Sequence, residues 1–233
     1  MGSIMGKGFA PATRDLRSVT AGFEKRVLVW LAGRMPARVN SDHLTALGFV
    51  AILGAGASFA VARWWPLALA AVPLWLVVNW FGDSLDGTLA RVRDQQRPRY
   101  GFYVDHVLDA AGTLALVGGM GLSGYMSGTL ALAVLVAYFL VLVETFLATH
   151  ARSVFKMSFL GIGATELRVL VAVGALTLLV RPTVTVFGTT RLLFDVSAVV
   201  AIAGLAFAFL TAVVRNTRAL YREEPVPARG PLS

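Results

Sequence analysis

The sequence predicts an all-α membrane protein with six transmembrane helices and an N-terminal amphipathic helix on the membrane surface. Of its 233 residues, 57% are hydrophobic and only 15% are charged, whereas soluble domains average about 25% charged residues. The mean hydropathy is +0.71. The apolar residues fall into six long runs separated by short polar or basic turns, and most runs approach the roughly 20 residues that a helix needs to cross a bilayer.

The amphipathic helix is predicted within residues 16–40. Apolar side chains recur at steps of three and four residues from Leu16 to Met35, with basic side chains between them. This pattern is typical of a helix that lies flat on a membrane, and Pro36 then ends the helix. A soluble helix that binds a partner would show the same pattern, so that alternative stays open. We expect residues 1–15 to form a flexible lead.

The six predicted spans form one transmembrane domain over residues 41–222. The second span continues as a helix through Asp83 to about Val92, and the third begins near Phe102, after a basic turn that contains Pro98 as a helix breaker. The last residues, 223–233, are rich in proline and are expected to form a flexible tail. The spans cover roughly residues 41–61, 67–92, 102–122, 129–149, 163–180 and 192–214.

Basic residues are distributed unevenly between the two ends of the spans. One end carries the N-terminal region, the turn at 91–99, the loop after the fourth span and the C-terminal arginines, while the other has only Arg63, Arg181 and Arg191. By the positive-inside rule the first end faces the cytoplasm. We therefore expect a protein of the cytoplasmic membrane. The net charge of +8 comes from basic residues in these loops. The sequence shows no basic face with interleaved aromatic residues, so binding to nucleic acid is not predicted.

Four aspartates lie where the second and third spans reach this cytoplasmic end. Asp83 and Asp86 are three residues apart, and Asp105 and Asp109 are four apart, so each pair shares one face of a helix. Carboxylates in membrane helices are costly and usually functional, and on facing helices they would repel one another without a cation. Hard oxygen ligands suit Mg²⁺, Mn²⁺ or Ca²⁺. The pattern predicts a divalent metal site; solvated acids on amphipathic helices, or a helix cap at Asp83, are the alternative.

The order of these residues resembles the signature of the CDP-alcohol phosphotransferase family. The matching string is Asp83-x-x-Asp86-Gly87-x-x-Ala90-Arg91, followed by Gly101-x-x-x-Asp105-x-x-x-Asp109. The gap between the two halves is about one residue longer than usual, in a turn where an insertion is tolerable.

The resemblance implies that the transmembrane domain at residues 41–222 is catalytic and has a metal cofactor, a base and a nucleotide site. The implied cofactor is two ions of Mg²⁺ or Mn²⁺. Asp109 would also deprotonate the acceptor hydroxyl. A homodimer is implied as well. The expected metal ligands are Asp83, Asp86, Asp105 and Asp109, and the expected nucleotide-binding residues are Asp83, Gly87, Ala90, Arg91 and Gly101.

A second group of polar residues lies near the same end and could bind the acceptor. The basic residues of this group could hold an acceptor phosphate, although anchoring of the loops by the positive-inside rule explains them equally well. Glu166 could bind a cationic acceptor or favour its own helix N-terminus. His106 could act in the site or contact a neighbouring helix. The group comprises His106, Arg152, Lys156, Glu166 and Arg168.

The expected function is transfer of a phosphatidyl group from CDP-diacylglycerol to a small polar alcohol, with release of CMP, in phospholipid synthesis. The expected partners are this CDP-linked lipid, the alcohol and membrane lipids. The Asp105-His106 string and Glu166 also fit a variant that transfers a phospho-head group from CDP-choline or CDP-ethanolamine to diacylglycerol. The tight aspartate spacing argues against a membrane prenyltransferase, and the lack of an internal repeat argues against a divalent-cation transporter.

Overall fold

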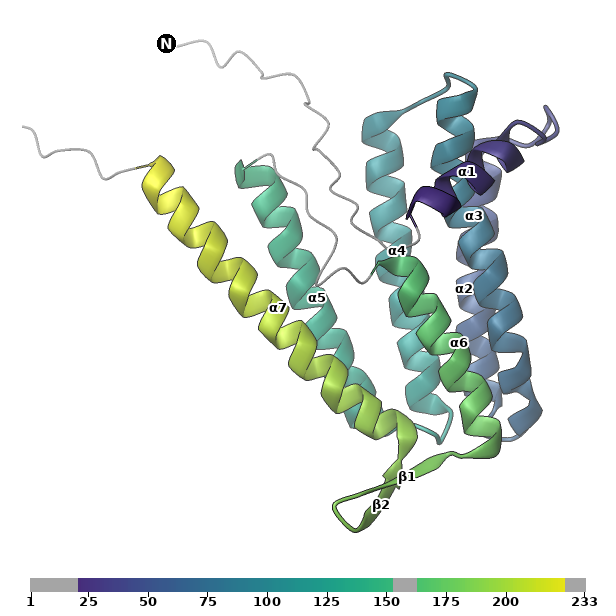
Figure 1. The fold of residues 1–233 in the computed structure, drawn as a ribbon, viewed down its shortest axis with the longest axis vertical. Coiled ribbons are helices and arrows are strands. Elements are labelled where there is room, and N and C mark those ends of the chain that lie inside the picture. Colours follow the sequence, from purple (N-terminus) through teal and green to yellow (C-terminus); the bar gives the residue numbers. More distant parts are fainter. Residues whose placement is uncertain (1–20, 153–162, 225–233) are drawn as a thin grey trace, which may run out of the picture.

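The computed structural model describes residues 21–152 and 163–224, which form helices and one β-hairpin (Figure 1). The elements are α1 (Ala21–Ala32), α2 (Ser41–Val61), η1 (Pro66–Ala71), α3 (Val72–Val92), α4 (Pro98–Leu122), α5 (Gly128–Arg152), α6 (Ala164–Val180), β1 (Thr183–Val186), β2 (Thr189–Leu192) and α7 (Leu193–Glu223). The predicted lead at residues 1–15, the start of the predicted surface helix at 16–20 and residues 225–233 of the predicted tail lie outside the described residues.

Among the described residues, four helical stretches are long and apolar enough to cross a membrane, namely α2, η1 together with α3, α5 and α7. Each of the six predicted spans is helical. However, α4 carries Asp105 and Asp109 in its first half, and α6 has only 17 residues, about 26 Å of helix at 1.5 Å per residue. The helical fold is confirmed with four candidate spans, and the crossing of the membrane by α4 and α6 stays a prediction.

Glycines let α2 pack closely against both α3 and α4. A Cβ added at Gly82 of α3 would lie 2.5 Å from the backbone nitrogen of Gly48, and one added at Gly119 of α4 would lie 2.0 Å from the carbonyl oxygen of Gly56. Neither distance leaves room for a methyl group, so the two crossings require glycine. As a result α3 and α4 are both held against the same central helix.

The turn at residues 93–97 reverses the chain between α3 and α4, which run in opposite directions (Figure 1). Asp83 and Asp86 lie in the second half of α3, and Asp105 and Asp109 lie in the first half of α4. The reversal therefore brings both predicted pairs to the same end of the bundle. The larger apolar core lies toward the opposite end, where it includes Phe59, Leu69, Val72, Leu178 and Phe194.

The helix α1 lies across the carboxylate end of the bundle (Figure 1). Its Leu28 and Ala32 are buried in a second apolar cluster with Leu44, Leu85 and Leu89. The predicted extent of this helix is wrong at its C-terminal end, because α1 stops at Ala32 and residues 33–40 are not helical. The reason is Gly33, which has low helix propensity and precedes Pro36 closely. Attachment of α1 to the membrane surface stays a prediction.

Two further boundaries differ from the sequence prediction. The third span was expected to begin near Phe102 with Pro98 in the preceding turn, but Pro98 is the first residue of α4. Proline is favoured at this position because the first helical N–H needs no partner within the helix. The expected turn after the fifth span is an antiparallel hairpin, β1–β2, closed by Phe187 and Gly188. This hairpin is an exception to the predicted all-α fold.

Candidate active site

Three of the four predicted aspartates come together between α3 and α4. One carboxylate oxygen from each of Asp83, Asp105 and Asp109 lies within 4.8 Å of the others, and all three side chains are partly buried. Three like charges at this separation repel one another. Three hard oxygen donors on two facing helices are a suitable ligand set for Mg²⁺ or Mn²⁺. The residues present therefore fit a divalent cation.

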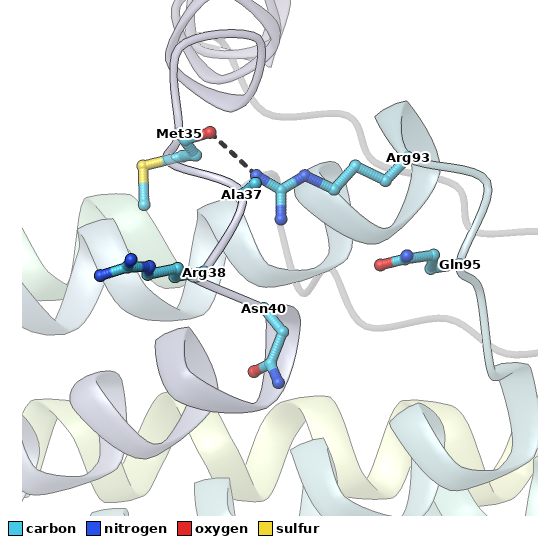
Figure 2. Close-up of a pocket in the computed structure, with 6 residues that line it drawn as sticks. All are labelled: Met35, Ala37, Arg38, Asn40, Arg93 and Gln95. Carbon is cyan, nitrogen blue, oxygen red and sulfur yellow. Dashed lines mark hydrogen bonds between the residues drawn. The ribbon is translucent and has the colours of Figure 1, made fainter.

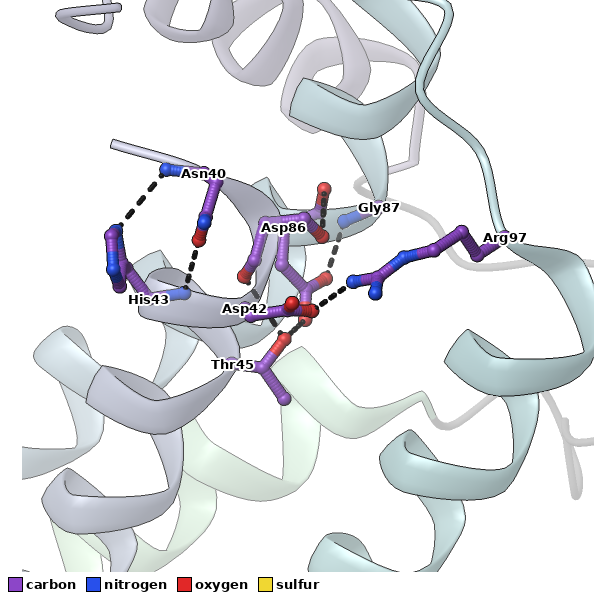
Figure 3. Close-up of polar contacts among 8 residues, drawn as sticks. Asn40, Asp42, His43, Thr45, Asp86, Gly87 and Arg97 are labelled. Carbon is purple, nitrogen blue, oxygen red and sulfur yellow. Dashed lines mark hydrogen bonds and ion pairs between the residues drawn. The ribbon is translucent and has the colours of Figure 1, made fainter. Parts of the chain in front are cut away.

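Asp86, the fourth predicted ligand, contacts the start of α2 (Figure 3) and is not among the three carboxylates that lie within 4.8 Å of one another. The Thr45 hydroxyl donates a hydrogen bond of 2.6 Å to Asp86 Oδ2, and the Gly87 backbone N–H donates to Asp86 Oδ1. The Ser41 hydroxyl donates to the Asp86 backbone carbonyl at 3.0 Å. The first turn of α2 thus holds both the backbone and the side chain of Asp86.

The start of α2 is fixed by a reciprocal cap and by an ion pair (Figure 3). The Asn40 Oδ1 accepts a hydrogen bond from the His43 backbone N–H at 2.9 Å, and the Asn40 N–H donates to His43 Nδ1 at 3.3 Å. Asp42 pairs with Arg97, which immediately precedes α4, and this hydrogen bond raises the pKa of the Arg97 guanidinium above its ordinary value. One short segment of α2 therefore contacts the chain around both aspartate pairs.

The predicted nucleotide residues border open space at this end of the bundle. A Cβ added at Gly101 would meet no described atom within 4 Å, and one added at Gly87 would meet only the Arg91 guanidinium at 3.5 Å. Ala90 lines a hollow of about 290 Å³ with six other residues, which are Asn40, Ser41, Asp42, Leu89, Gln95 and Arg97. Arg91 donates to Thr88 Oγ1 at 3.0 Å. Space and hydrogen-bonding groups thus adjoin Gly87 and Ala90.

A second hollow, of about 520 Å³, lies next to the first and shares Asn40 and Gln95 with it. Figure 2 shows it between the segment that joins α1 to α2 and the end of α3. Arg93 crosses between these two walls and donates to the backbone carbonyls of Met35 at 2.9 Å, Pro36 at 3.0 Å and Val39. Its guanidinium therefore fixes the linker to the end of the helix that carries Asp83 and Asp86.

Arg168, predicted as an acceptor-binding residue, lies directly on the triad. From α6 its guanidinium forms an ion pair with Asp83 Oδ2 and donates to Asn79 Oδ1 at 2.7 Å. Asn79 lies one turn before Asp83 on α3, and its side-chain amide donates to the Gly48 carbonyl at 2.9 Å. The helix α6 therefore contributes to the site through Arg168.

The other described acceptor candidates contact different groups. His106 is buried, with Nδ1 2.6 Å from the Phe102 carbonyl and 3.9 Å from Asp105 Oδ2 of the triad, and its ring lies against Phe102 and Phe146. Glu166 Oε2 accepts from the Gly163 N–H at 3.0 Å. Arg152 on α5 bonds to Asn216 at 2.9 Å and Glu223 at 3.1 Å on α7. Lys156 lies outside the described residues.

Sequence reasoning missed two polar residues that the structure places at the site, Thr45 and Asn79. Asn79 had a usable signal, because an amide in an otherwise apolar membrane helix is usually functional or hydrogen-bonded. Thr45 had a weaker one, since a threonine near a helix start commonly bonds to its own backbone. The Ser41 carbonyl is a second acceptor for the single Thr45 hydroxyl proton, at 3.1 Å, and Asp86 Oδ2 is the nearer one at 2.6 Å.

Comparison with known protein families agrees with this geometry. The family model for CDP-alcohol phosphatidyltransferase matches residues 39–214. The match begins just before α2, ends within α7, and includes all four aspartates. No curated protein matched the chain in a separate sequence search. The resemblance seen in the aspartate motif is thus confirmed by a match over most of the chain, and the protein belongs to the CDP-alcohol phosphatidyltransferase family.

Proposed function

We propose that the protein transfers a phosphatidyl group from CDP-diacylglycerol to a small polar alcohol and releases CMP. The observation that carries this proposal is the triad of Asp83, Asp105 and Asp109, which lies beside the open space at Gly87 and Gly101 in a chain of this family. A diphosphate donor carries dense negative charge, and a triad of carboxylates attracts such a donor only through bound cations.

The proposed ligands of two Mg²⁺ or Mn²⁺ ions are Asp83, Asp105, Asp109 and Asp86. When bound, such ions neutralise the diphosphate and stabilise the departing CMP. Asp86 would join the set through lone pairs that its hydrogen bonds to Thr45 and Gly87 leave available. The nucleotide would lie along Gly87, Ala90 and Gly101, where the missing or small side chains leave room, and Arg91 would hold its phosphate end.

Asp109 is proposed as the base of the reaction. It would accept the proton of the acceptor hydroxyl while the hydroxyl oxygen forms a bond to the donor phosphorus and the bond from phosphorus to CMP breaks. A carboxylate is a weak base, so its placement beside the attacking oxygen must provide the advantage. Candidate acceptor contacts are His106, Arg152, Lys156, Glu166 and Arg168. Among the described ones, Arg168 pairs with Asp83 of the triad, and His106 Nδ1 lies 3.9 Å from Asp105 Oδ2.

We further propose that α4 and α6 cross the membrane with the four candidate spans and that the triad faces the cytoplasm. Support comes from the excess of arginine and lysine at the turn between α3 and α4 and near both termini. The Gly-rich helices and the family also make a homodimer our expectation. The orientation is tested by introducing single cysteines at the two ends of the bundle, one in the turn at residues 93–97 and one in the β1–β2 loop. Their reactivity toward a reagent that cannot cross the membrane shows which end faces the cytoplasm.

The function is tested by measuring CMP release from purified protein in detergent. CDP-diacylglycerol is supplied with Mg²⁺ or Mn²⁺ and a panel of acceptors: glycerol phosphate, inositol, inositol phosphate, serine, choline and ethanolamine. We expect release that depends on one acceptor and is lost in Asp109→Asn and with a chelator. Asp94→Asn is the matched control, because Asp94 lies in the adjacent turn, is exposed and has a φ of 54° that asparagine tolerates.

Release in the wild type that persists in Asp109→Asn would remove Asp109 from its role as base. If no acceptor gives release, CDP-choline and CDP-ethanolamine with diacylglycerol are tested next. The absence of release from every CDP-linked donor would contradict the proposed function.

A further inference from the structure

The contact between Arg168 and Asp83 has a consequence for metal binding. The Nε and one terminal nitrogen of the guanidinium are used together, the first on Asn79 Oδ1 at 2.7 Å and the second on Asp83 Oδ2. The Arg168 side chain is 15% exposed and that of Asp83 is 27% exposed. An ion pair with so little access to water is screened much less than a surface pair.

Asn79 fixes the position of this guanidinium. Asn79 is buried on α3, and its amide nitrogen is occupied by the Gly48 carbonyl of α2 at 2.9 Å. The amide oxygen must therefore face Arg168, and the arginine is held by two groups from one helix. The guanidinium is thus placed by a built network that joins α2, α3 and α6, and its presence on Asp83 does not depend on an exposed, freely rotating side chain.

Asp83 is also one of the three carboxylates whose oxygens lie within 4.8 Å of one another. A divalent cation bound by this triad would have to share Asp83 with a guanidinium that already bears a full positive charge. Two cations on one carboxylate repel each other. A guanidinium is always charged, so the conflict cannot be relieved by loss of a proton.

We propose that Arg168 is a displaceable counter-ion of Asp83, which neutralises the carboxylate in the metal-free protein and competes with the divalent cation for it. The inference rests on the metal site of the proposed function. It explains how three clustered carboxylates persist in a helical membrane protein before a metal ion arrives. It also means that metal loading frees a guanidinium beside the reacting groups, where a phosphate oxygen of a substrate could replace Asp83 as its partner.

The opposite possibility is that Arg168 supports metal binding by orienting Asp83, as outer hydrogen-bond partners of metal ligands often do. The two roles predict opposite changes in metal affinity when Arg168 is replaced. Removal of a competitor tightens metal binding and destabilises the metal-free protein. Removal of an orienting partner weakens metal binding.

The test is a titration with Mn²⁺ alone, followed by electron paramagnetic resonance of the free ion, on the full chain in detergent. We compare the wild type with Arg168→Gln and Arg168→Lys. We expect Arg168→Gln to lower the dissociation constant for Mn²⁺ about tenfold or more, which corresponds to the loss of one moderate electrostatic penalty. Arg168→Lys keeps the charge and should stay within a few fold of the wild type.

Arg218→Gln is the matched control, because Arg218 is an exposed arginine of α7 and its replacement changes the net charge equally. It should leave the dissociation constant unchanged. An unchanged or raised dissociation constant in Arg168→Gln would overturn the proposal, and a raised one would assign Arg168 the orienting role.

Thermal unfolding without and with Mn²⁺ gives a second readout. We expect the metal-free Arg168→Gln variant to melt below the wild type, and Mn²⁺ to raise its melting temperature by more than that of the wild type. If the metal-free variant does not fold, it is purified with Mn²⁺ and the rate of Mn²⁺ loss to a chelator is compared with that of the wild type; slower loss supports the proposal and equal or faster loss contradicts it.

Both measurements are independent of turnover. Tight Mn²⁺ binding without CMP release would contradict the proposed reaction and leave the competition intact. No Mn²⁺ binding by the wild type or by any variant would contradict the metal site itself and this inference with it.

Discussion

The Thr45 hydroxyl on α2 donates a hydrogen bond of 2.6 Å to Asp86 Oδ2 on α3. The two residues are 41 positions apart in the chain, and the bond joins the first turn of one helix to the carboxylate-bearing part of another. Hydrogen bonds to a charged group are worth about 1.5–3 kcal/mol. We infer that Thr45 is a positioning residue, which sets the direction of the Asp86 carboxylate.

Thr45→Val should therefore reduce catalysis while leaving the fold in place. Valine has nearly the shape of threonine but no hydroxyl, so Asp86 loses its α2 donor. We expect CMP release to fall about tenfold, from the loss of one such hydrogen bond, and Thr45→Ser to keep most of the activity. The apparent KM for the CDP donor and kcat are measured separately, together with the melting temperature. A purely structural role would lower the melting temperature in parallel with the activity.

Two adjacent glycines of α4 give a sharp test of helix packing. Gly119→Ala would place a methyl group 2.0 Å from the Gly56 carbonyl oxygen, whereas Gly118→Ala meets no described atom within 4 Å. Overpacking of this kind typically costs about 1–3 kcal/mol, so Gly119→Ala should unfold at clearly lower temperature or denaturant concentration. Gly118→Ala should match or slightly exceed the wild type, since alanine favours helix. Equal effects of the two variants would show that α2 and α4 do not cross where the structure places them.

The aspartate site was predictable because its residues are close in sequence and its helices are regular. Asp83, Asp105 and Asp109 are positioned by helical periodicity and one short reversal of the chain, and both features can be read from spacing. The contacts of Thr45 and Arg168 were not predictable in this way. Their partners lie 41 and 85 residues away, and only the packing of α2 and α6 on α3 brings them together.

Helix ends and the hairpin show a different limit of sequence reasoning. Pro98 was interpreted as a breaker, although the same fixed φ angle that breaks a helix interior also favours the first helical position. The strands β1 and β2 have only four residues each, too few for an alternating pattern to stand out beside long apolar helices. In both cases the local signal permitted two structures and the tertiary arrangement selected one.

Phe187 lies in the two-residue loop of this hairpin with φ of 47°, followed by Gly188 with φ of 76°. Positive φ at both positions is typical of a type I′ turn, which favours Asn-Gly, and a bulky side chain there is strained by about 1–2 kcal/mol. Because the Phe187 ring is fully exposed, its removal loses no described contact. Phe187→Asn should therefore raise the thermal stability, whereas Gly188→Ala should lower it.

These two hairpin variants are compared by thermal unfolding in detergent and again in lipid nanodiscs. Phe187→Asn could stabilise the protein in detergent and destabilise it in nanodiscs. That result would show that contact of the Phe187 ring with lipid contributes more stability than the strained turn costs. Destabilisation in both media would contradict the turn assignment.

Arg93 fastens the linker between α1 and α2 to the end of α3 by donating to the carbonyls of Met35, Pro36 and Val39. Only a guanidinium offers enough donors in a fixed fork to serve three carbonyls from one side chain. Arg93→Lys should therefore release the linker even though it keeps the charge. We expect amide hydrogen exchange in residues 33–40 to become faster, and the apparent KM for the CDP donor to rise, because the linker forms one wall of the hollows beside Ala90.

Arg38→Gln is the control for this prediction, since Arg38 lines the same hollow but makes none of these three contacts. It removes a charge and keeps the linker attached, so exchange in residues 33–40 should stay at the wild-type rate. If instead Arg38→Gln accelerates exchange as much as Arg93→Lys does, the linker is held by the overall charge of the hollow and not by the fork of Arg93. If exchange becomes faster in Arg93→Lys while the KM stays unchanged, the linker has been released without any effect on donor binding. The two hollows would then have no part in binding the nucleotide.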